Sequence, residues 1–310
     1  MVSCVILAGY NARELRAYKK ALRSGYPGED IIPSYKALLS FSSAQGKTTL
    51  LQSTIDITST LEQQNVLDDV VIVGPEQRLL PHVQHWLSNK HVLVDQNASL
   101  ENLAEEFSLQ LDTNSLCGNA IKGYARTRAY AKREPALFLA SDSPFTSPDG
   151  ISAFLLKAKD AALVLPIVKM QGKRDACNRR YFYLNTLEGI RGFRLSSYLL
   201  ANPHQLDISV IEKVYSLRKI LSWQVQKRFF SALLKTDILG GLWLLAKYAV
   251  YQLHKEDCED YLSRALKGKC LLLPTDDVYS TYDVDTNKDV SHLQHIMENY
   301  IKQPPLTSTR

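Results

Sequence analysis

Short apolar runs alternate with stretches of helical periodicity through the first half of this 310-residue chain. The runs are rich in Val, Ile and Leu, which is typical of parallel strands covered on both faces. They predict strands at 2–8, 69–74, 91–95, 136–140 and 161–168. The spacing of apolar residues between them predicts helices near 47–64, 76–88, 99–111, 119–133 and 147–158. This alternation predicts an α/β fold with a doubly wound, mostly parallel sheet.

A carboxylate, Asp142, follows directly after the predicted strand at 136–140. In doubly wound sheets ligands bind outside the carboxyl ends of the strands, because loops and helix N-termini converge there. The end of the first predicted strand, in LAGYNAREL from residue 7, lies on the same edge. Ser147 as N-cap and Pro148 as first helical residue begin the next helix. We therefore expect binding chemistry at this edge.

The pattern changes between residues 170 and 275. A polar, basic stretch leads to a β-like segment, and a long helical region follows from about 205 to 267. KCLLL from 269 and VYSTYDV from 278 then predict strands that return to the sheet, before a closing helix that Thr286 caps. We expect one domain over 1–310, with 170–275 as a largely helical, substrate-side insertion within it.

Composition narrows the function only slightly. The net charge of +5 fits an anionic small substrate, a nucleic acid or a membrane surface equally well. Five cysteines are scattered without a CxxC pair, so neither a disulfide framework nor a structural zinc site is expected. The N-terminus lacks the pattern of a signal peptide. We expect a cytoplasmic protein with reduced thiols.

The most apolar long segment covers 229–253, and its lysines and aspartate interrupt it too often for a spanning helix. Packing onto the protein's own core is the first interpretation. Because basic residues lie just upstream, peripheral contact of the 205–255 region with anionic lipid is the second. These residues are Arg218, Lys219, Lys227 and Arg228.

Six short motifs occur in an informative order: VILAGYNAREL from 5, SYKALL from 34, GKTTLLQSTI from 46, VVIVGP from 70, LASDSPF from 139 and YDVDTNKDV from 282. Their order and spacing resemble MobA-like NTP transferases, a branch of the nucleotidyltransferases with the nucleotide-diphospho-sugar transferase fold. The resemblance covers about the first 170 and the last 40 residues. It implies a Rossmann-like α/β fold and a transfer of nucleotides.

In that family the loop after the first strand wraps the nucleotide's phosphates. The resemblance therefore implies nucleotide contacts from Leu7, Ala8, Gly9, Tyr10 and Asn11. Tyr10 stands where the family has a second glycine, and Asn11, Ala12 and Arg13 replace its Gly-Thr-Arg core. A backbone that approaches phosphate closely needs small residues, so Arg13 or Arg16 is expected to supply compensating charge.

We expect different roles for the two lysines that follow this loop in the sequence. Lys36 in SYKALL corresponds to the family lysine that neutralises developing charge in the transfer. Lys47 in GKTTL copies the end of a P-loop, but Phe41 stands where the first glycine of that motif belongs and no strand ends just before it. We reject the P-loop and expect Lys47 at the surface.

Carboxylates would hold the metal that the family uses. Phosphoryl transfer depends on positioning and charge neutralisation, so hard oxygen ligands must hold Mg²⁺, or alternatively Mn²⁺, against the α-phosphate. Asp142 resembles the first metal aspartate of the family. Asp283 and Asp285 are the two candidates for the second metal aspartate, and both side chains would lie on one face of a regular strand. The alternative is that all three carboxylates cap helices or turns.

Base and acceptor recognition have weaker signals. Gly118 and Asn119 stand at a predicted helix start, where a free N–H and an amide can read a base edge, while Asn119 as a simple N-cap is equally compatible. Lys169, with Lys173 or Arg174 beyond it, is a candidate to bind the acceptor's phosphate; a solvated basic loop is the alternative.

The leading hypothesis is a Mg²⁺-dependent nucleotidyltransferase that joins an NTP to a phosphorylated small-molecule acceptor and releases pyrophosphate. It implies these two small molecules as partners and no nucleic acid. A second hypothesis is a GT-A-like glycosyltransferase that uses a nucleotide-sugar, because DVD at 283–285 is an Asp-x-Asp pair. A third is a degenerate, non-catalytic transferase fold that binds lipid or a protein partner.

Overall fold

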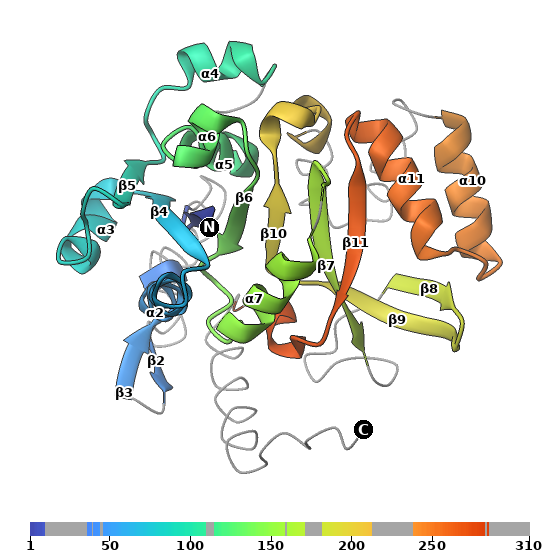
Figure 1. Ribbon diagram of the computed structural model, residues 1–310, viewed down its shortest axis with the longest axis horizontal. Helices are drawn as coiled ribbons and strands as arrows, with labels where there is room; N and C mark the ends of the chain where they lie inside the picture. The colour runs from blue at the N-terminus through green and yellow to red at the C-terminus, as the bar shows by residue number, and fades with distance from the viewer. Residues whose placement is uncertain are drawn as a thin grey trace, which may run out of the picture.

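The computed structural model describes residues 1–9, 36–38, 40–43, 46–109, 115–158, 160–170, 182–212, 238–282 and 284 (Figure 1). Within these residues nine strands form one sheet: β1 (Val2–Leu7), β4 (Leu67–Gly74), β5 (His91–Asp95), β6 (Ala136–Ala140), β7 (Leu163–Met170), β8 (Phe182–Thr186), β9 (Gly189–Leu195), β10 (Tyr198–Ala201) and β11 (Cys270–Thr275). A separate hairpin pairs β2 (Ser40–Ser43) with β3 (Gly46–Thr49).

The sheet order begins β5-β4-β1-β6-β10-β7, and β11 pairs with β7 as well. β5, β4, β1 and β6 are parallel to one another, as are β7 and β11. β10 is antiparallel to both β6 and β7, so those two strands run in the same direction. The predicted α/β fold with a mostly parallel sheet is confirmed.

β9 and β10 pair with different parts of the same edge of β7. β11 occupies one edge of β7 from Leu163 to Val168. β10 pairs with the start of β7 and β9 with its end, so both must use the opposite edge. β9 then pairs with β8 as an antiparallel ribbon beyond the main sheet. The sequence pattern did not predict β10, which completes the centre of the sheet.

Helices connect and cover these strands. They are α2 (Leu50–Gln63), α3 (Glu76–Val83), α4 (Glu101–Glu106), α5 (Leu116–Tyr124), α6 (Arg128–Lys132), α7 (Pro148–Lys157), α10 (Ile238–Ala249) and α11 (Lys255–Leu266), with 3-10 turns η1 (Lys36–Leu38), η2 (Pro203–Gln205) and η3 (Val278–Thr281). As predicted, Ser147 caps α7 by accepting the Gly150 N–H at 3.2 Å, and Pro148 follows it.

Three predicted elements differ from the observed ones. The helix expected at 119–133 is two helices: α5 ends at Tyr124, and Thr127 caps α6 by accepting the Tyr130 N–H. The helix expected from 47 begins at Leu50, since residues 46–49 pair with β2. The strand expected at 278–284 begins as η3, because both the N–H and the hydroxyl of Ser280 bond the Asp277 carbonyl and turn the chain.

Alternating residues of the central strands fill two apolar layers. Cys4 and Ile6 of β1 face a cluster that includes side chains of α2, α3 and α7. Val5 of β1 faces a second cluster with α5, α6 and the end of α11. Both faces of the sheet are therefore buried, which explains why its strands are continuous apolar runs.

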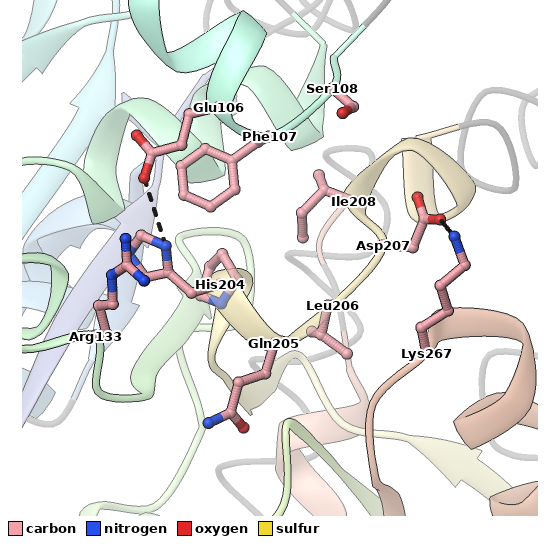
Figure 2. A pocket seen from close by; sticks show the side chains of 11 residues that line it. Glu106, Phe107, Ser108, Arg133, His204, Gln205, Leu206, Asp207, Ile208 and Lys267 are labelled. Atoms are coloured by element: carbon pink, nitrogen blue, oxygen red, sulfur yellow. Dashed lines mark ion pairs between the residues drawn. The ribbon is translucent and has the colours of Figure 1, made fainter.

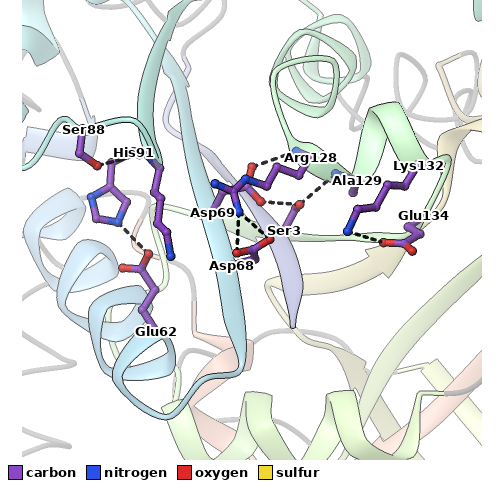
Figure 3. A network of polar contacts seen from close by, with 11 residues as sticks. Ser3, Glu62, Asp68, Asp69, Ser88, His91, Arg128, Ala129, Lys132 and Glu134 are labelled. Atoms are coloured by element: carbon purple, nitrogen blue, oxygen red, sulfur yellow. Dashed lines mark hydrogen bonds and ion pairs between the residues drawn. The ribbon is translucent and has the colours of Figure 1, made fainter.

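A polar network joins the amino ends of β1 and β4 to α6 (Figure 3). Asp69 is buried and accepts hydrogen bonds from the Ser3 hydroxyl at 2.5 Å and the Arg128 N–H at 3.0 Å. Ser3 in turn accepts the Ala129 N–H at 3.1 Å. The Asp69 carboxylate therefore binds the first backbone N–H of α6 and fixes the start of this helix to the sheet.

Candidate active site

The strand register aligns the central strands of the sheet with one another. Paired positions across neighbouring strands put Cys4, Val70, His91, Leu137, Val164 and Leu271 on one level, the last two strands being reached through Leu200 of β10. Beyond these paired positions, Gly9 follows the end of β1, Asp142 follows the end of β6 and Lys169 lies near the end of β7. Because β1, β6 and β7 run in the same direction, these predicted site residues from three separate motifs lie at the carboxyl ends of their strands.

The backbone of Asp142 lies against the end of the chain. The N–H of Val284 donates to the carbonyl oxygen of Asp142 at 2.9 Å. Asp142 itself is half-buried, and its loop leaves the sheet where Ser141 donates its N–H to the Leu7 carbonyl at 3.2 Å. Residue 284 is thus beside the tip of β6, although the two positions are far apart in the sequence.

Apolar packing holds this contact in position. Val284 is 1% exposed and belongs to a small cluster with Phe41, Leu50 and Tyr282, against which Phe145 packs. Phe41 and Phe145 meet edge to face, with ring centroids 5.5 Å apart. The hairpin β2–β3, the start of α2 and the loop after β6 therefore support one site.

The aspartates expected as the second metal ligand, Asp283 and Asp285, lie outside the described residues. Carboxylate oxygens are the ligands that Mg²⁺ prefers, and Asp142 offers them at the tip of β6. The choice of Asp283 or Asp285 as its companion stays a prediction.

Gly9 adjoins two polar side chains at the start of the predicted phosphate loop. A Cβ at this position would lie 2.7 Å from the Asn119 amide nitrogen and 3.0 Å from the Gln96 side-chain oxygen. Ala8 is buried, and its N–H bonds the Val73 carbonyl. Of the remaining phosphate-loop candidates, Tyr10, Asn11 and Arg13 lie outside the described residues, and Leu7 is half-buried at the end of β1.

Asn119 is 4% exposed, and its side-chain oxygen has no hydrogen-bond partner. It is not the N-cap of α5: Ser115 is, and its hydroxyl accepts the Gly118 N–H at 2.9 Å. The Gly118 N–H is therefore already used, whereas the amide of Asn119 has an open acceptor. A buried orphan acceptor costs free energy unless another group satisfies it, which is a reason to expect a ligand donor there.

Lys122 and Gln96 complete this corner, and neither stood out in the sequence. Lys122 is 3% exposed and donates to the Gln96 carbonyl oxygen. It lies three residues after Asn119, so both side chains share one face of α5. The signal available in the sequence was this polar pair at helical spacing in an otherwise apolar helix.

Lys169 projects from the end of β7 and forms an ion pair with Glu188 in the turn between β8 and β9. Arg191 lies 3.5 Å from the same carboxylate. The lysine's hydrogen bond and charge, with help from Arg191, lower the pKa of Glu188. β10 lies between β6, whose end Asp142 follows, and β7, which carries Lys169. Lys36 is the first residue of η1, just before β2.

A buried carboxylate that the sequence did not single out, Asp277, lies next to this edge. Its oxygen accepts the Ser147 N–H at 3.1 Å at the start of α7. Its other oxygen has no partner, and burial raises the pKa of Asp277 from its ordinary value to about 6. Ser280 donates its hydroxyl to the Ser196 hydroxyl, and its carbonyl accepts the Ser197 N–H. These bonds join η3 to the bend between β9 and β10.

Other candidate features in the described residues carry no site chemistry. No group of three or more ligating side chains forms a metal cluster among them, and His82 and His85 are exposed on α3 and just after it. Their four cysteines, Cys4, Cys117, Cys258 and Cys270, are free thiols. No described helix has the length and apolar character needed to cross a bilayer.

A cavity of about 500 Å³ opens at the opposite, amino edge of the sheet, where η2 follows β10 (Figure 2). The ionisable groups there are largely paired with one another: Glu106 lies 3.5 Å from His204, and Asp207 lies 2.9 Å from Lys267. Because the cavity is at the other end of the strands, we distinguish it from the candidate site.

Comparison with known proteins addresses the fold. No protein-family model matches the chain, and no curated protein is a significant relative. A solved structure from Thermus thermophilus, described as a hypothetical transferase, has 21% sequence identity and a TM-score of 0.54, covering 93% of this chain and 99% of its own. The chain shares the fold of that structure. At 21% identity this likeness shows the fold and not the reaction.

Two further structures are described as 4-diphosphocytidyl-2C-methyl-D-erythritol synthases. The one from Anaerococcus prevotii has 10% identity and a TM-score of 0.41, covering 96% of each chain. The other has 10% identity and a TM-score of 0.45, covering 95% of this chain and 97% of its own. These likenesses are too weak to bear on the fold or the chemistry of this protein.

Proposed function

We propose that this protein is a nucleotidyltransferase that joins an NTP to a phosphorylated small-molecule acceptor and releases pyrophosphate. The contact between the Val284 N–H and the Asp142 carbonyl is the observation that supports it most directly. Asp283 and Asp285, the aspartates expected to bind the cation with Asp142, are the sequence neighbours of Val284. The order of the sequence motifs that resemble those of MobA-like NTP transferases supports the same reaction.

The reaction needs little covalent participation by the protein. An oxygen of the acceptor's phosphate attacks the α-phosphorus of the NTP, and the bond from that phosphorus to the bridging oxygen breaks. The electron pair leaves with pyrophosphate. Positioning and charge neutralisation provide most of the catalysis. A Mg²⁺ or Mn²⁺ ion bound by Asp142 with Asp283 or Asp285 would supply part of that neutralisation.

Residues on either side of Asp142 divide the substrates between them. On the β1 side, Gly9 lets the start of the loop lie close against the side chains of Asn119 and Gln96, and the open acceptor of Asn119 suits a donor on the base or ribose. Arg13 and Lys36 would neutralise the phosphates. On the β7 side, Lys169 would bind the acceptor's phosphate by exchanging its partner Glu188.

Two measurements test the proposal. A thermal-shift screen of the four NTPs, with and without Mg²⁺, should raise the melting temperature for at least one nucleotide, since a ligand that binds only the native state stabilises it. Pyrophosphate should then be released from that NTP when a pool of phosphorylated sugars and alditols is added. If no NTP binds and no pool gives pyrophosphate, the proposal is wrong.

The glycosyltransferase alternative rests on the Asp-x-Asp pair at 283–285. It predicts release of a nucleoside diphosphate from a UDP- or GDP-sugar in place of pyrophosphate from an NTP. The same incubations therefore separate the two reactions. A non-catalytic protein would give neither product and no stabilisation by nucleotide with Mg²⁺.

A further inference from the structure

Helix α10 presents an apolar stripe to the outside of the molecule. Its outward side chains include Leu239, Leu242, Trp243 and Ala246, and Val250 continues the series just after the helix. These positions follow the spacing i, i+3, i+4, i+7 and i+11 of one helical face. Leu239 is 81% exposed, Trp243 63% and Val250 61%. We call these five residues the α10 stripe.

The opposite face of α10 is anchored. Leu244 packs against a buried cluster that includes Leu253, as do Cys258 and Leu262 of α11. Figure 1 shows α10 at the outer end of the molecule, beyond α11. The stripe is therefore held outward on a helix that is fixed from behind.

The one charged residue of α10 is occupied on the protein. Lys247 bonds Asp257 of α11 at 2.6 Å, and its ammonium lies 5.3 Å from the centre of the Trp243 ring. The stripe itself carries no charge. Tyr248 and Tyr251, 41% and 58% exposed, lie close to it in the sequence. Trp and Tyr beside exposed aliphatic side chains are typical of surfaces that enter the membrane–water interface.

The sequence just before α10 carries the charge of the whole protein. Residues 213–237 contain six lysines and arginines and one aspartate, a net +5, which equals the net charge of the full chain. The net charge of all the other residues together is zero. The segment is covalently joined to α10 at Ile238. A positive charge next to an apolar stripe is complementary to an anionic bilayer, whose headgroups attract basic residues and whose interior accepts the apolar ones.

We propose that the α10 stripe docks on membranes that contain anionic phospholipid. A second copy of this chain fits less well, because two segments of +5 would repel each other. An acidic protein would satisfy the charge but would not by itself require exposed Leu and Trp at helical spacing. The proposal is independent of the reaction at the carboxyl edge of the sheet.

Vesicle flotation of the full-length protein tests it. Vesicles with about 30% phosphatidylserine should bind the protein about tenfold or more tightly than pure phosphatidylcholine vesicles, and added salt should weaken this binding. The double variant Leu242→Glu with Trp243→Glu should reduce binding by about tenfold or more, because charged side chains oppose insertion. Leu156→Glu is the matched control: Leu156 is 80% exposed on α7, away from the stripe, and its variant should bind as the unmodified protein does.

Circular dichroism and thermal melting of each variant establish that it is folded, which is expected since all three positions are exposed. Equal binding to the two kinds of vesicle would overturn the proposal. So would equal losses in the stripe variant and the Leu156 control. If the protein forms dimers that the stripe variant abolishes and does not bind vesicles, the stripe is a contact between copies and lipid docking is wrong.

Discussion

The backbone N–H of Val284 and the backbone carbonyl of Asp142 are joined by a hydrogen bond of 2.9 Å. The bond links the C-terminal part of the chain to the loop after β6. Val284 is fully packed while Asp142 remains half-buried, so the contact is anchored on one side and accessible on the other. Any role of Asp142 in binding a cation therefore depends on the chain near residue 284 remaining in place.

Replacing the Asp142 carboxylate should abolish activity without unfolding the protein. We expect Asp142→Asn to lower pyrophosphate release by about 100-fold or more, because a neutral amide is a poor ligand for a divalent cation. Asp149→Asn, an exposed carboxylate in the first turn of α7, is the control and should keep full activity. Initial rates at saturating Mg²⁺ measure both. Equal activity of the two variants would exclude metal binding by Asp142.

The buried carboxylate of Asp277 should make stability depend on pH. Its pKa is raised to about 6, so the folded state holds a proton that the unfolded state releases near pH 4. Stability from this group is complete below pH 4 and is lost as the pH rises through 6. Asp277→Asn stays neutral, so relative to the unmodified protein it should gain about 2 to 3 kcal/mol between pH 4 and pH 8. Urea unfolding at several pH values tests this.

The exposed neighbour Asp276 offers a control for that measurement. Asp276→Asn should change the free energy of unfolding by less than about 0.5 kcal/mol at any pH. A stability difference between Asp277→Asn and the unmodified protein that stays constant from pH 4 to pH 8 would contradict the raised pKa.

A methyl group at Gly9 should disturb the nucleotide corner. In Gly9→Ala the new Cβ would lie 2.7 Å from the Asn119 amide nitrogen, so that side chain or the loop must move. We expect a loss of about 1 to 3 kcal/mol in stability and a weaker thermal shift with NTP. Gly9→Ala combined with Asn119→Ala should regain most of the stability. Additive losses in the double variant would show that the two positions do not contact each other.

Removing the Asn119 side chain should separate binding from folding. Because its oxygen has no partner, Asn119→Ala should cost less stability than a typical buried polar truncation, about 1 kcal/mol or less. The nucleotide affinity should fall about tenfold or more if a ligand donor uses that oxygen. Isothermal titration with the preferred NTP measures the affinity. Unchanged affinity would remove Asn119 from the nucleotide site.

Two neighbouring aspartates of β4 should differ in their contribution to stability. Asp69 is buried and accepts from Ser3 and from the α6 N-terminus, so Asp69→Ala should cost about 2 to 4 kcal/mol. Asp68 pairs with the half-exposed guanidinium of Arg128 at 3.0 Å, and Asp68→Ala should cost about 1 kcal/mol or less. Denaturant unfolding compares the two. Similar costs would contradict the structural role given to Asp69.

The local pattern of apolar residues was sufficient to predict most strands of the sheet. The runs at 91–95 and 136–140 are the strands β5 and β6 with the same bounds. β6 is buried along nearly its whole length, and a continuous apolar run is the pattern of such a strand. β10 escaped prediction because YLLA is only four residues long and its pairing partners, β6 and β7, are distant in the sequence. Its strand conformation comes from that pairing and not from periodicity.

The sequence by itself determined the α/β class, most of the strands that carry it, and the expectation that Gly9 and Asp142 belong to one edge. It could do so because strand ends and turn residues are local signals. Only the tertiary structure decided that residue 284 lies beside Asp142, that the oxygen of Asn119 is buried without a partner, and that Asp277 lies at the N-terminus of α7. Those relationships arise from burial and long-range packing, which depend on how distant segments meet and leave no mark in the spacing of residues along the chain.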